Sequence, residues 1–441
     1  MSRWEALPLD ILYLEIEYLD TYEDIELFCS SDSYLDEKIC QDPDGKFWQN
    51  LFKQTLSEDI NLDSDETVMS KYVKDKQKIK DLIEEGAIDK SYDIKGFPQY
   101  YQLYTFIAEK GYVKLLDNIF TGKDLKSLYK LKEIPFSLEV LDFMLFDAIE
   151  AGSLSMVKYL VEHSANLHAY NDVIMDDILF SPHVEILEYV INSQYANNIN
   201  SLQEFINKRK YNDELDAIKS KQKVFIIDQL NKNNIEIVKQ NIPNIVELDN
   251  LPLLNFLVKK GIHINIDDPA FDRQIMDNIK HHQFAWPKFI IDYMSMNLNQ
   301  PFTKKDLETS IQYFIEQANT YNNLSLMQYI LRELIEYRPL VLNFIIDNNH
   351  IDWFKHYIED VGPIDKFNTP NINEILKRAL LNVYAPQYLY IFKYLEQHGA
   401  NFVDVVYDIT QNRDNSEYWK RNAIDILYRL NTQPIIIYPK F

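Results

Sequence analysis

One pattern recurs along most of this chain: two apolar residues, two variable residues, then two more apolar residues. On an α-helix this spacing places the apolar side chains in one stripe. The second residue of each copy is, in order, Leu116, Val157, Leu187, Leu254, Ile290, Met327, Phe354 and Phe392. Copies are 27 to 41 residues apart except for one interval of 67, and they average 34.5 residues if that interval holds a further unit. Because short helices with one apolar face cannot bury it alone, the spacing predicts an all-α array of stacked helix pairs.

The clearest copy lies in residues 145–168. Ala148 and Gly152 stand four residues apart, one helical turn, and give a small-residue face that another backbone can approach closely. Met156 and Val157 begin the apolar stripe of a second helix, and Ser164-Ala165-Asn166 ends that helix with small, turn-forming residues. The segment therefore predicts two short antiparallel helices.

This unit resembles an ankyrin repeat. The residues that fall in that family's register are Ala148, Gly152, Val157, Leu160, Val161 and Ala165. The family's Thr-Pro-Leu-His opening is replaced by residues 143–146, and the Gly of its turn by Ser164. Gly399-Ala400-Asn401 is close to the family's turn, and Gly261 to Asn265 keeps its Gly and Asn. The resemblance implies an ankyrin-like α-solenoid of helix pairs over residues 97–441. Tetratricopeptide and other α-solenoids space their helices similarly and stay as alternatives.

Three segments of the predicted array depart from the repeat. Residues 195–250 and 266–285 fit it poorly, and we expect helices with insertions there. Residues 434–441 are too short and too proline-flanked for another repeat, so we expect an extended tail on the last helices.

The first 56 residues predict a small helical segment of a different kind. Leu7-Pro8 begins a helix, with proline at a first-turn position where its missing N–H costs nothing. An apolar stripe follows at helical spacing, and residues 21–24 read as the cap of a second short helix. This order resembles an F-box, on Leu7-Pro8, Tyr18-Leu19-Asp20, Glu23-Asp24-Ile25 and Trp48-Gln49-Asn50-Leu51.

The F-box resemblance implies docking on the Skp-type adaptor of a cullin–RING ubiquitin ligase. Carried over by position, the adaptor-binding residues are Leu7, Pro8, Ile11, Leu12, Ile16, Leu19, Ile25 and Leu27. The alternative interpretation is that these residues form the core of an N-terminal helical cap, which a solenoid needs to cover its first repeat.

Residues 57–96 are predicted to connect the two parts. The segment 57–66 is polar and acidic and reads as a linker, and a helix follows it. Residues 71–80 hold five lysines, which we interpret as a solvated helix face that partly neutralises the acidic segment before it. A nucleic-acid patch would be expected to carry arginines and interleaved aromatic residues.

Composition excludes several classes of function. The net charge is −23, which disfavours binding to nucleic acid or to an anionic membrane. Two cysteines, Cys29 and Cys40, are too few for a disulfide framework and fit a reducing compartment. We find no signal peptide and no apolar run of the ~18 residues that a membrane span needs. We therefore expect an intracellular, cytoplasmic protein.

No motif for chemistry is present. With 9 glycines in 441 residues, Gly-rich nucleotide loops are improbable, and neither a Walker loop nor a Rossmann run occurs. His281-His282 is the only histidine pair, and no metal-ligand spacing accompanies it or the cysteines. We predict no enzymatic activity, no catalytic residue, no metal and no cofactor.

Together these patterns predict a protein-binding adaptor. The N-terminal segment would hold the ubiquitin-ligase adaptor while the solenoid presents an unknown target protein. The alternative is a stand-alone scaffold or virion component without a ubiquitin-ligase link. The combination of parts, with the Ile, Asn, Lys and Tyr excess of an AT-rich genome, resembles the ankyrin and F-box proteins of giant DNA viruses of amoebae. That resemblance implies action in the host cell.

Overall fold

The computed structural model describes residues 12, 13, 16, 19, 22–63, 66–88, 100–122, 138–193, 202, 205–207, 214–298, 301–348, 353, 354, 356, 376, 377, 379–381, 389–397, 400–412 and 417–432. In these residues the regular structure is helical and includes no strand, apart from one isolated bridge between Leu298 and Phe302. The predicted all-α class is therefore confirmed. The chain divides into two compact units, residues 1–241 with 252–257, and residues 242–251 with 258–441.

The first unit begins with short elements around a small core. After residues 12, 13 and 16, which are helical, come α2 (Tyr22–Ser30), α3 (Ser33–Leu35), the π-helix η1 (Asp36–Cys40), α4 (Lys46–Thr55) and α5 (Val68–Ile88). Leu35, Ile39 and Trp48 are fully buried in this core. The indole N–H of Trp48 donates to the carbonyl oxygen of Ile39 at 2.7 Å, so this buried donor is satisfied.

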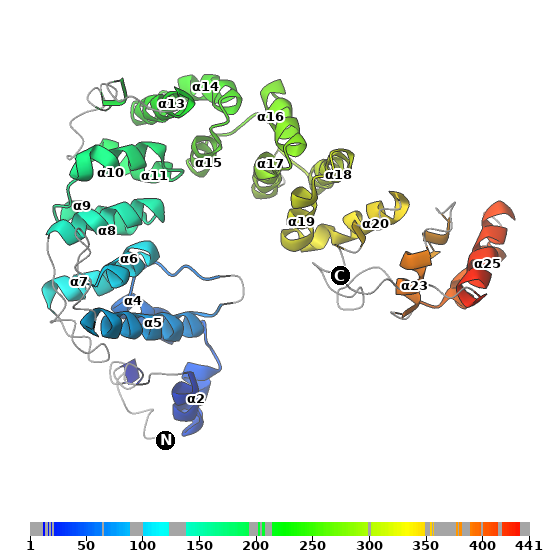
Figure 1. Cartoon of the computed structure of the whole chain (residues 1–441), viewed down its shortest axis with the longest axis horizontal. Coiled ribbons are helices and arrows are strands. Elements are labelled where there is room, and N and C mark those ends of the chain that lie inside the picture. Colours follow the sequence, from blue (N-terminus) through cyan, green and yellow to red (C-terminus); the bar gives the residue numbers. More distant parts are fainter. Residues whose placement is uncertain are drawn as a thin grey trace. The chain divides into compact units, whose positions relative to one another are not determined.

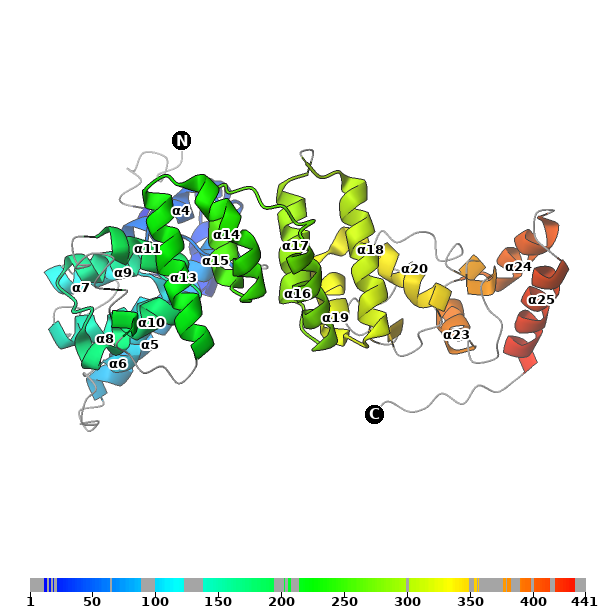
Figure 2. The same cartoon turned by 90° about the horizontal axis from the view of Figure 1, so that it is seen from above.

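Helix hairpins follow along the chain (Figures 1 and 2). They are α6 (Tyr101–Lys110) with α7 (Val113–Thr121), α8 (Leu138–Glu150) with α9 (Leu154–Glu162), α10 (Ala169–Phe180) with α11 (Val184–Asn192), and α13 (Glu214–Asn231) with α14 (Ile235–Glu247). The first helices α6, α8 and α10 pack side by side, as do the second helices α7, α9 and α11. Each hairpin thereby covers the apolar face of its neighbour.

The second unit continues with helices of similar length. It contains α16 (Pro269–Lys280), α17 (Ala285–Met296), α18 (Lys304–Thr320), α19 (Leu324–Glu333), the short 3-10 helix η3 (Ile335–Tyr337), α20 (Arg338–Asn348), α23 (Leu389–Gln397), α24 (Phe402–Gln411) and α25 (Glu417–Thr432). The order α16–α17–α18–α19 is again a succession of packed helices. The boundary between the units passes through α14 and α15 (Leu251–Lys259).

The residues that anchor the recurring sequence pattern all lie in the core. The buried set is Leu116, Val157, Leu187, Leu254, Ile290, Met327, Phe354 and Phe392, each at most 3% exposed. Each lies in a helix. The prediction that the pattern marks the apolar face of helices is confirmed.

One backbone geometry closes most of these hairpins. The turn residue adopts a left-handed conformation, with φ between 51° and 73°, at Gly111, Gly152, Asn233, Asp249, His282 and Asn322. The N–H of the following residue donates to a carbonyl five residues back, as in Tyr112 to Ile107 (3.0 Å) and Asn323 to Ala318 (2.7 Å). This bond satisfies a carbonyl that the helix end leaves without an intrahelical partner.

Neighbouring turns of the first unit touch one another. A Cβ added to Gly111 would meet the side chain of Ser153 in the next turn, and one added to Gly152 would meet the imidazole ring of His183. Glycine adopts the left-handed backbone at both positions without strain, and the close approach leaves no room there for a Cβ. The predicted small-residue face at Gly152 is therefore a turn-to-turn contact.

Turns of the second unit are linked by hydrogen bonds instead. The indole N–H of Trp286 donates to the Asp249 carboxylate at 2.6 Å. The Asn323 side-chain amide donates to the carbonyl oxygens of Ile279 (3.1 Å) and Gln283 (2.8 Å). These bonds fix the register between successive turns.

The long interval in the sequence pattern contains extra helical structure. Between Leu187 and Leu254 lie α13 and α14, and α14 connects to α15 through another left-handed turn at Asp249. Residues 214–259 are thus three helices in succession, and α13 and α14 fall in the segment 195–250, where we expect helices with insertions. The helix expected within 266–285 is α16, whose N-cap Asp268 accepts from the Ala270 N–H. Residues 434–441 lie outside the described residues.

The lysine-rich helix α5 differs from the expectation of a solvated face. Lys71 and Lys76 are 7% and 3% exposed, and of the five lysines only Lys74 and Lys78 are exposed. α5 packs against both α4 and α6. The interpretation of residues 71–80 as a solvated face was therefore wrong on one side of the helix. Lys71 pairs with Asp75 on the same helix, and Lys76 donates to the carbonyl oxygen of Leu19, 57 residues away.

Candidate functional site

The N-terminal segment is the candidate site, because all eight residues predicted to bind the adaptor belong to it. Leu12, Ile16 and Ile25 are at most 1% exposed. Leu19 is partly exposed, and Leu27 is 72% exposed. Leu7, Pro8 and Ile11 lie outside the described residues.

The buried members of this set cannot reach a partner from where they lie. Leu12, Ile16 and Ile25 contribute to the core of the segment, as the cap interpretation requires. A helical stripe in the sequence shows which side of a helix is apolar, but it does not show whether that side faces the chain's own core. Sequence reasoning therefore placed buried and exposed residues in one docking surface.

Leu27 stands on an exposed face of α2. Asp24, Glu26 and Ser30 are exposed on the same nine-residue helix. The carbonyl oxygen of Leu27 accepts a hydrogen bond from the Ser30 hydroxyl at 3.0 Å, which closes the end of the helix. The result is one large apolar side chain beside acidic neighbours. Such a face can insert a leucine into an apolar pocket of a partner.

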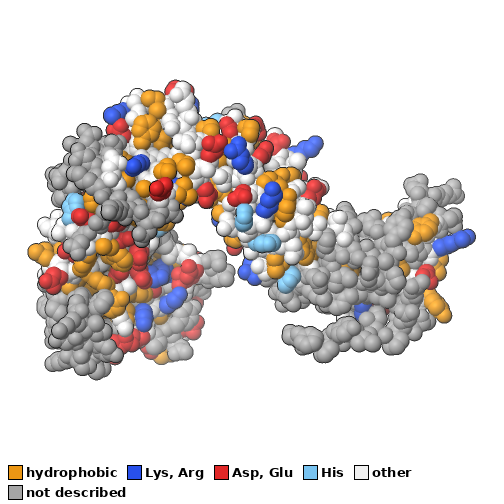
Figure 3. All heavy atoms as spheres, turned by 45° about the horizontal axis from the view of Figure 1, so that its top comes forward, with side chains coloured by type: hydrophobic (Ala, Val, Ile, Leu, Met, Phe, Trp, Pro, Cys, Tyr) orange, Lys and Arg blue, Asp and Glu red, His pale blue; other side chains and the backbone are white. Residues whose placement is uncertain are grey.

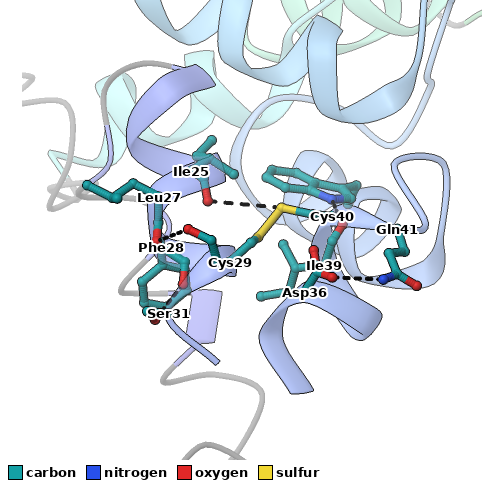
Figure 4. The surroundings of a disulfide bond; sticks show 11 residues. Ile25, Leu27, Phe28, Cys29, Ser31, Asp36, Ile39, Cys40 and Gln41 are labelled. Carbon is teal, nitrogen blue, oxygen red and sulfur yellow. Dashed lines mark hydrogen bonds between the residues drawn. A yellow bond between two sulfur atoms is a disulfide. The ribbon is translucent and has the colours of Figure 1, made fainter. Parts of the chain in front are cut away.

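A disulfide bond ties α2 to η1 (Figure 4). Cys29 lies on α2 and is 1% exposed, Cys40 ends η1 and is partly buried, and their Cα atoms are 6.3 Å apart. The Cys40 sulfur also lies 4.0 Å from the carbonyl oxygen of Ile25. The structure thus pairs the two cysteines, because α2 and η1 bring residues 11 apart in sequence face to face. A separation of 11 residues in the sequence does not by itself predict that the two cysteines lie close enough to bond.

A buried ionic cluster connects α5 to its neighbours. Lys71 Nζ lies 3.0 Å from Asp75 Oδ2 and 3.8 Å from Glu66 Oε2. The Tyr112 hydroxyl, from the α6–α7 turn, donates to the same Asp75 carboxylate. Lys76 Nζ donates to the carbonyl oxygen of Leu19 at 2.8 Å. The cluster therefore joins the N-terminal segment to α5, and α5 to the first hairpin.

Two pKa shifts in this cluster stabilise the protonation states of Tyr112 and Glu66. Burial, together with the Asp75 carboxylate, raises the pKa of the Tyr112 hydroxyl far above its usual value. Although burial opposes it, ion pairing with Lys74 and Lys71 lowers the pKa of Glu66. The raised pKa keeps the Tyr112 hydroxyl neutral as a donor, and the lowered pKa keeps Glu66 ionised at neutral pH. The role that these contacts support is structural: they hold α5 to the N-terminal segment and to the first hairpin.

Carboxylates gather on the first helices of the hairpins. α6, α8 and α10 together carry eight Asp and Glu residues against one lysine. Burial, with the Glu109 and Glu150 carboxylates nearby, raises the pKa of Asp147 to about 6. Burial, with Glu150 and Asp176, raises the pKa of Asp177 to about 6 as well. On the face drawn in Figure 3, basic side chains are interspersed with acidic ones.

The described part of the chain contains no group of three or more His, Cys, Asp and Glu side chains arranged to hold a metal ion. His281 and His282 lie in the α16–α17 turn, where His281 Nδ1 is 2.8 Å from the Asp277 carbonyl oxygen. In the same described residues, no helix is long and apolar enough to cross a membrane.

Comparison with protein-family models, with curated proteins and with solved structures finds no match to this chain. A function must therefore be argued from the arrangement of the residues themselves.

Proposed function

We propose that the chain is a non-enzymatic interaction adaptor. Its N-terminal segment docks on the Skp-type adaptor of a cullin ubiquitin ligase, and its helix hairpins, stacked as an ankyrin-like solenoid, hold a target protein. The setting we propose is the cytoplasm of a host cell. Catalysis belongs to other subunits of such a ligase.

The observation that carries this proposal is the exposure of Leu27. A leucine that is 72% exposed on a short helix, above an otherwise closed core, is a ready anchor for a partner pocket. Exposed single leucines are common on protein surfaces. Exposure alone therefore does not mark a docking site. The further support is that Leu27 is one of the positions carried over from the F-box, which the order of elements in the first 56 residues resembles.

The test is binding of the purified full-length protein to a Skp-type adaptor, measured by calorimetry. We expect micromolar or tighter binding by the wild type, and a loss of at least about tenfold, ~1.4 kcal/mol, for Leu27→Asp. Leu138→Asp is the matched control, because Leu138 is 66% exposed at the start of α8 and outside the proposed surface. Ile16→Asp is unsuitable, since a charge at this buried position would unfold the segment.

Two results would remove the ubiquitin-ligase link. One is failure of the wild type to bind the adaptor at about 10 μM. The other is equal binding by Leu27→Asp and Leu138→Asp. The second candidate function, a stand-alone scaffold or virion component, would then stand. Burial of Leu12, Ile16 and Ile25 favours that alternative, because a solenoid cap needs such a core.

A further inference from the structure

The helix that carries Leu27 packs on short elements. α2 packs chiefly against η1 and α3, which are five and three residues long. At nine residues, α2 is shorter than the ~12–15 residues at which isolated helices become marginally stable in water. Its conformation therefore depends on what holds it to η1.

The Cys29–Cys40 bond is the covalent part of that attachment. Ile25 on α2 is also buried. At the end of α2, the hydroxyls of Ser30 and Ser31 donate to carbonyl oxygens three residues back. Opening the disulfide would thus remove a main constraint on α2 and leave the core around Trp48 in place.

We infer that Cys29 and Cys40 form a redox clamp that fixes α2 on η1 when oxidised and releases it when reduced. In reduction, an external thiolate attacks the more accessible Cys40 sulfur, and Cys29 leaves as a thiolate that takes up a proton. A second external thiol then resolves the mixed disulfide, so two thiols are oxidised to one disulfide while the protein gains two thiols. Oxidation is the reverse exchange, with a low-molecular-weight disulfide such as oxidised glutathione as the oxidant.

The clamp would regulate docking through Leu27. The oxidised protein presents Leu27 on an ordered helix, whereas the reduced protein must order α2 before it can bind and so binds more weakly. The effect on docking rests on the function proposed above, and the effect on α2 does not.

The experiment is hydrogen–deuterium exchange of the full-length protein, equilibrated with reduced or with oxidised glutathione. Alkylation and mass spectrometry read the thiol state of each sample. We expect α2 amides to exchange at least about tenfold faster in the reduced protein, while amides of α8, which is remote from any cysteine, do not change. In the Cys40→Ser variant, the α2 amides should exchange as fast as in the reduced protein, whether the sample holds reduced or oxidised glutathione.

Unchanged α2 exchange on reduction would overturn the clamp. So would thiols that remain open to alkylation in oxidised glutathione. Adaptor binding, measured on the same samples, separates the two proposals. If α2 protection follows the redox state but neither form binds the adaptor, the clamp stands and the docking proposal fails. If both forms bind equally while α2 stays protected, docking stands and the clamp fails.

Discussion

Glycine is scarce in this chain, and the places where it occurs are informative at the residue scale. Gly122 and Gly152 have almost the same backbone conformation, with φ of 65° and 73°. A Cβ at Gly122 would meet nothing within 4 Å, whereas one at Gly152 would meet the His183 ring. Alanine substitution at each of the two positions therefore separates two free-energy costs: that of a side chain on a left-handed backbone, and that of a close approach between turns.

We predict that Gly122→Ala lowers the free energy of unfolding by about 1 kcal/mol, the cost of placing a side chain in the left-handed region. Gly152→Ala should lower it by about 2–4 kcal/mol, because displacement of the His183 ring adds an overpacking cost. Urea unfolding followed by circular dichroism measures both. Equal losses in the two variants would show that the contact between neighbouring turns adds nothing to stability.

At Ser164 the chain has serine where the ankyrin turn has glycine. The φ of Ser164 is 77°, the same as that of Gly261, which occupies the corresponding turn of a later copy. A left-handed serine is strained, so Ser164→Gly should raise the free energy of unfolding by about 0.5–1 kcal/mol. Ser193→Gly serves as the control, because Ser193 ends α11 in an extended conformation. If Ser164→Gly is not stabilising, the strain at this turn is smaller than its backbone angle implies.

At the scale of elements, α5 holds the N-terminal segment to the first hairpin through buried charge. Removing one member of a buried ion pair leaves the other uncompensated. Asp75→Asn should therefore cost about 3 kcal/mol, although asparagine can still accept from the Tyr112 hydroxyl. Adding Lys71→Met should restore part of the loss, because it removes a buried ammonium that is left with only the Glu66 carboxylate, 3.8 Å away. Glu84→Gln, an exposed change on the same helix, should be neutral.

Thermal unfolding of these variants tests the cluster. The informative comparison is between Asp75→Asn and the double variant. If the double variant is no more stable than Asp75→Asn alone, the buried Lys71 ammonium is not the cause of the loss.

α5 also shows what the sequence could and could not predict. Helical periodicity correctly predicted the buried anchors such as Leu116 and Met327, because an apolar stripe must face a core. It failed for Lys71, whose helix neighbour Asp75 is itself bonded by the distant Tyr112, and for Lys76, which donates to the distant Leu19 carbonyl. The bonds from Tyr112 and to Leu19 are set by packing between segments far apart in the sequence. Periodicity failed in the same way to separate buried Ile16 from exposed Leu27.

The turns between helices show a second limit. One left-handed geometry is carried by four residue types at Gly152, Asn233, Asp249 and His282. The repeated feature is therefore a backbone angle and not a side chain. Of the turns at Gly111, Gly152, Asn233, Asp249, His282 and Asn322, a search for glycine finds only the first two.

At the scale of the whole molecule, the net charge of −23 governs the response to pH. Self-repulsion among like charges destabilises a compact state, and it falls as carboxylates take up protons. Asp147 and Asp177 should respond first, because their pKa values are raised to about 6 in the folded protein. Most other acidic side chains titrate near 4 when they are unperturbed.

The sign of this effect follows from proton binding. An aspartate with a raised folded pKa holds more protons in the folded than in the unfolded state, between about pH 6 and its unfolded pKa near 3.9. Stability therefore rises as pH falls through 6, and the penalty of the two charges is fully present at pH 7. We predict that the midpoint of thermal unfolding increases between pH 7.0 and pH 5.5.

The double variant Asp147→Asn with Asp177→Asn should melt about 3 °C higher than the wild type at pH 7.0 and should respond less to acidification. Glu139→Gln with Glu162→Gln removes the same charge from exposed positions and is the matched control. Because neither control residue is buried, this pair should leave the pH response almost as steep as in the wild type. An equal flattening by both pairs would mean that total charge, and not the burial of Asp147 and Asp177, sets the pH dependence of folding.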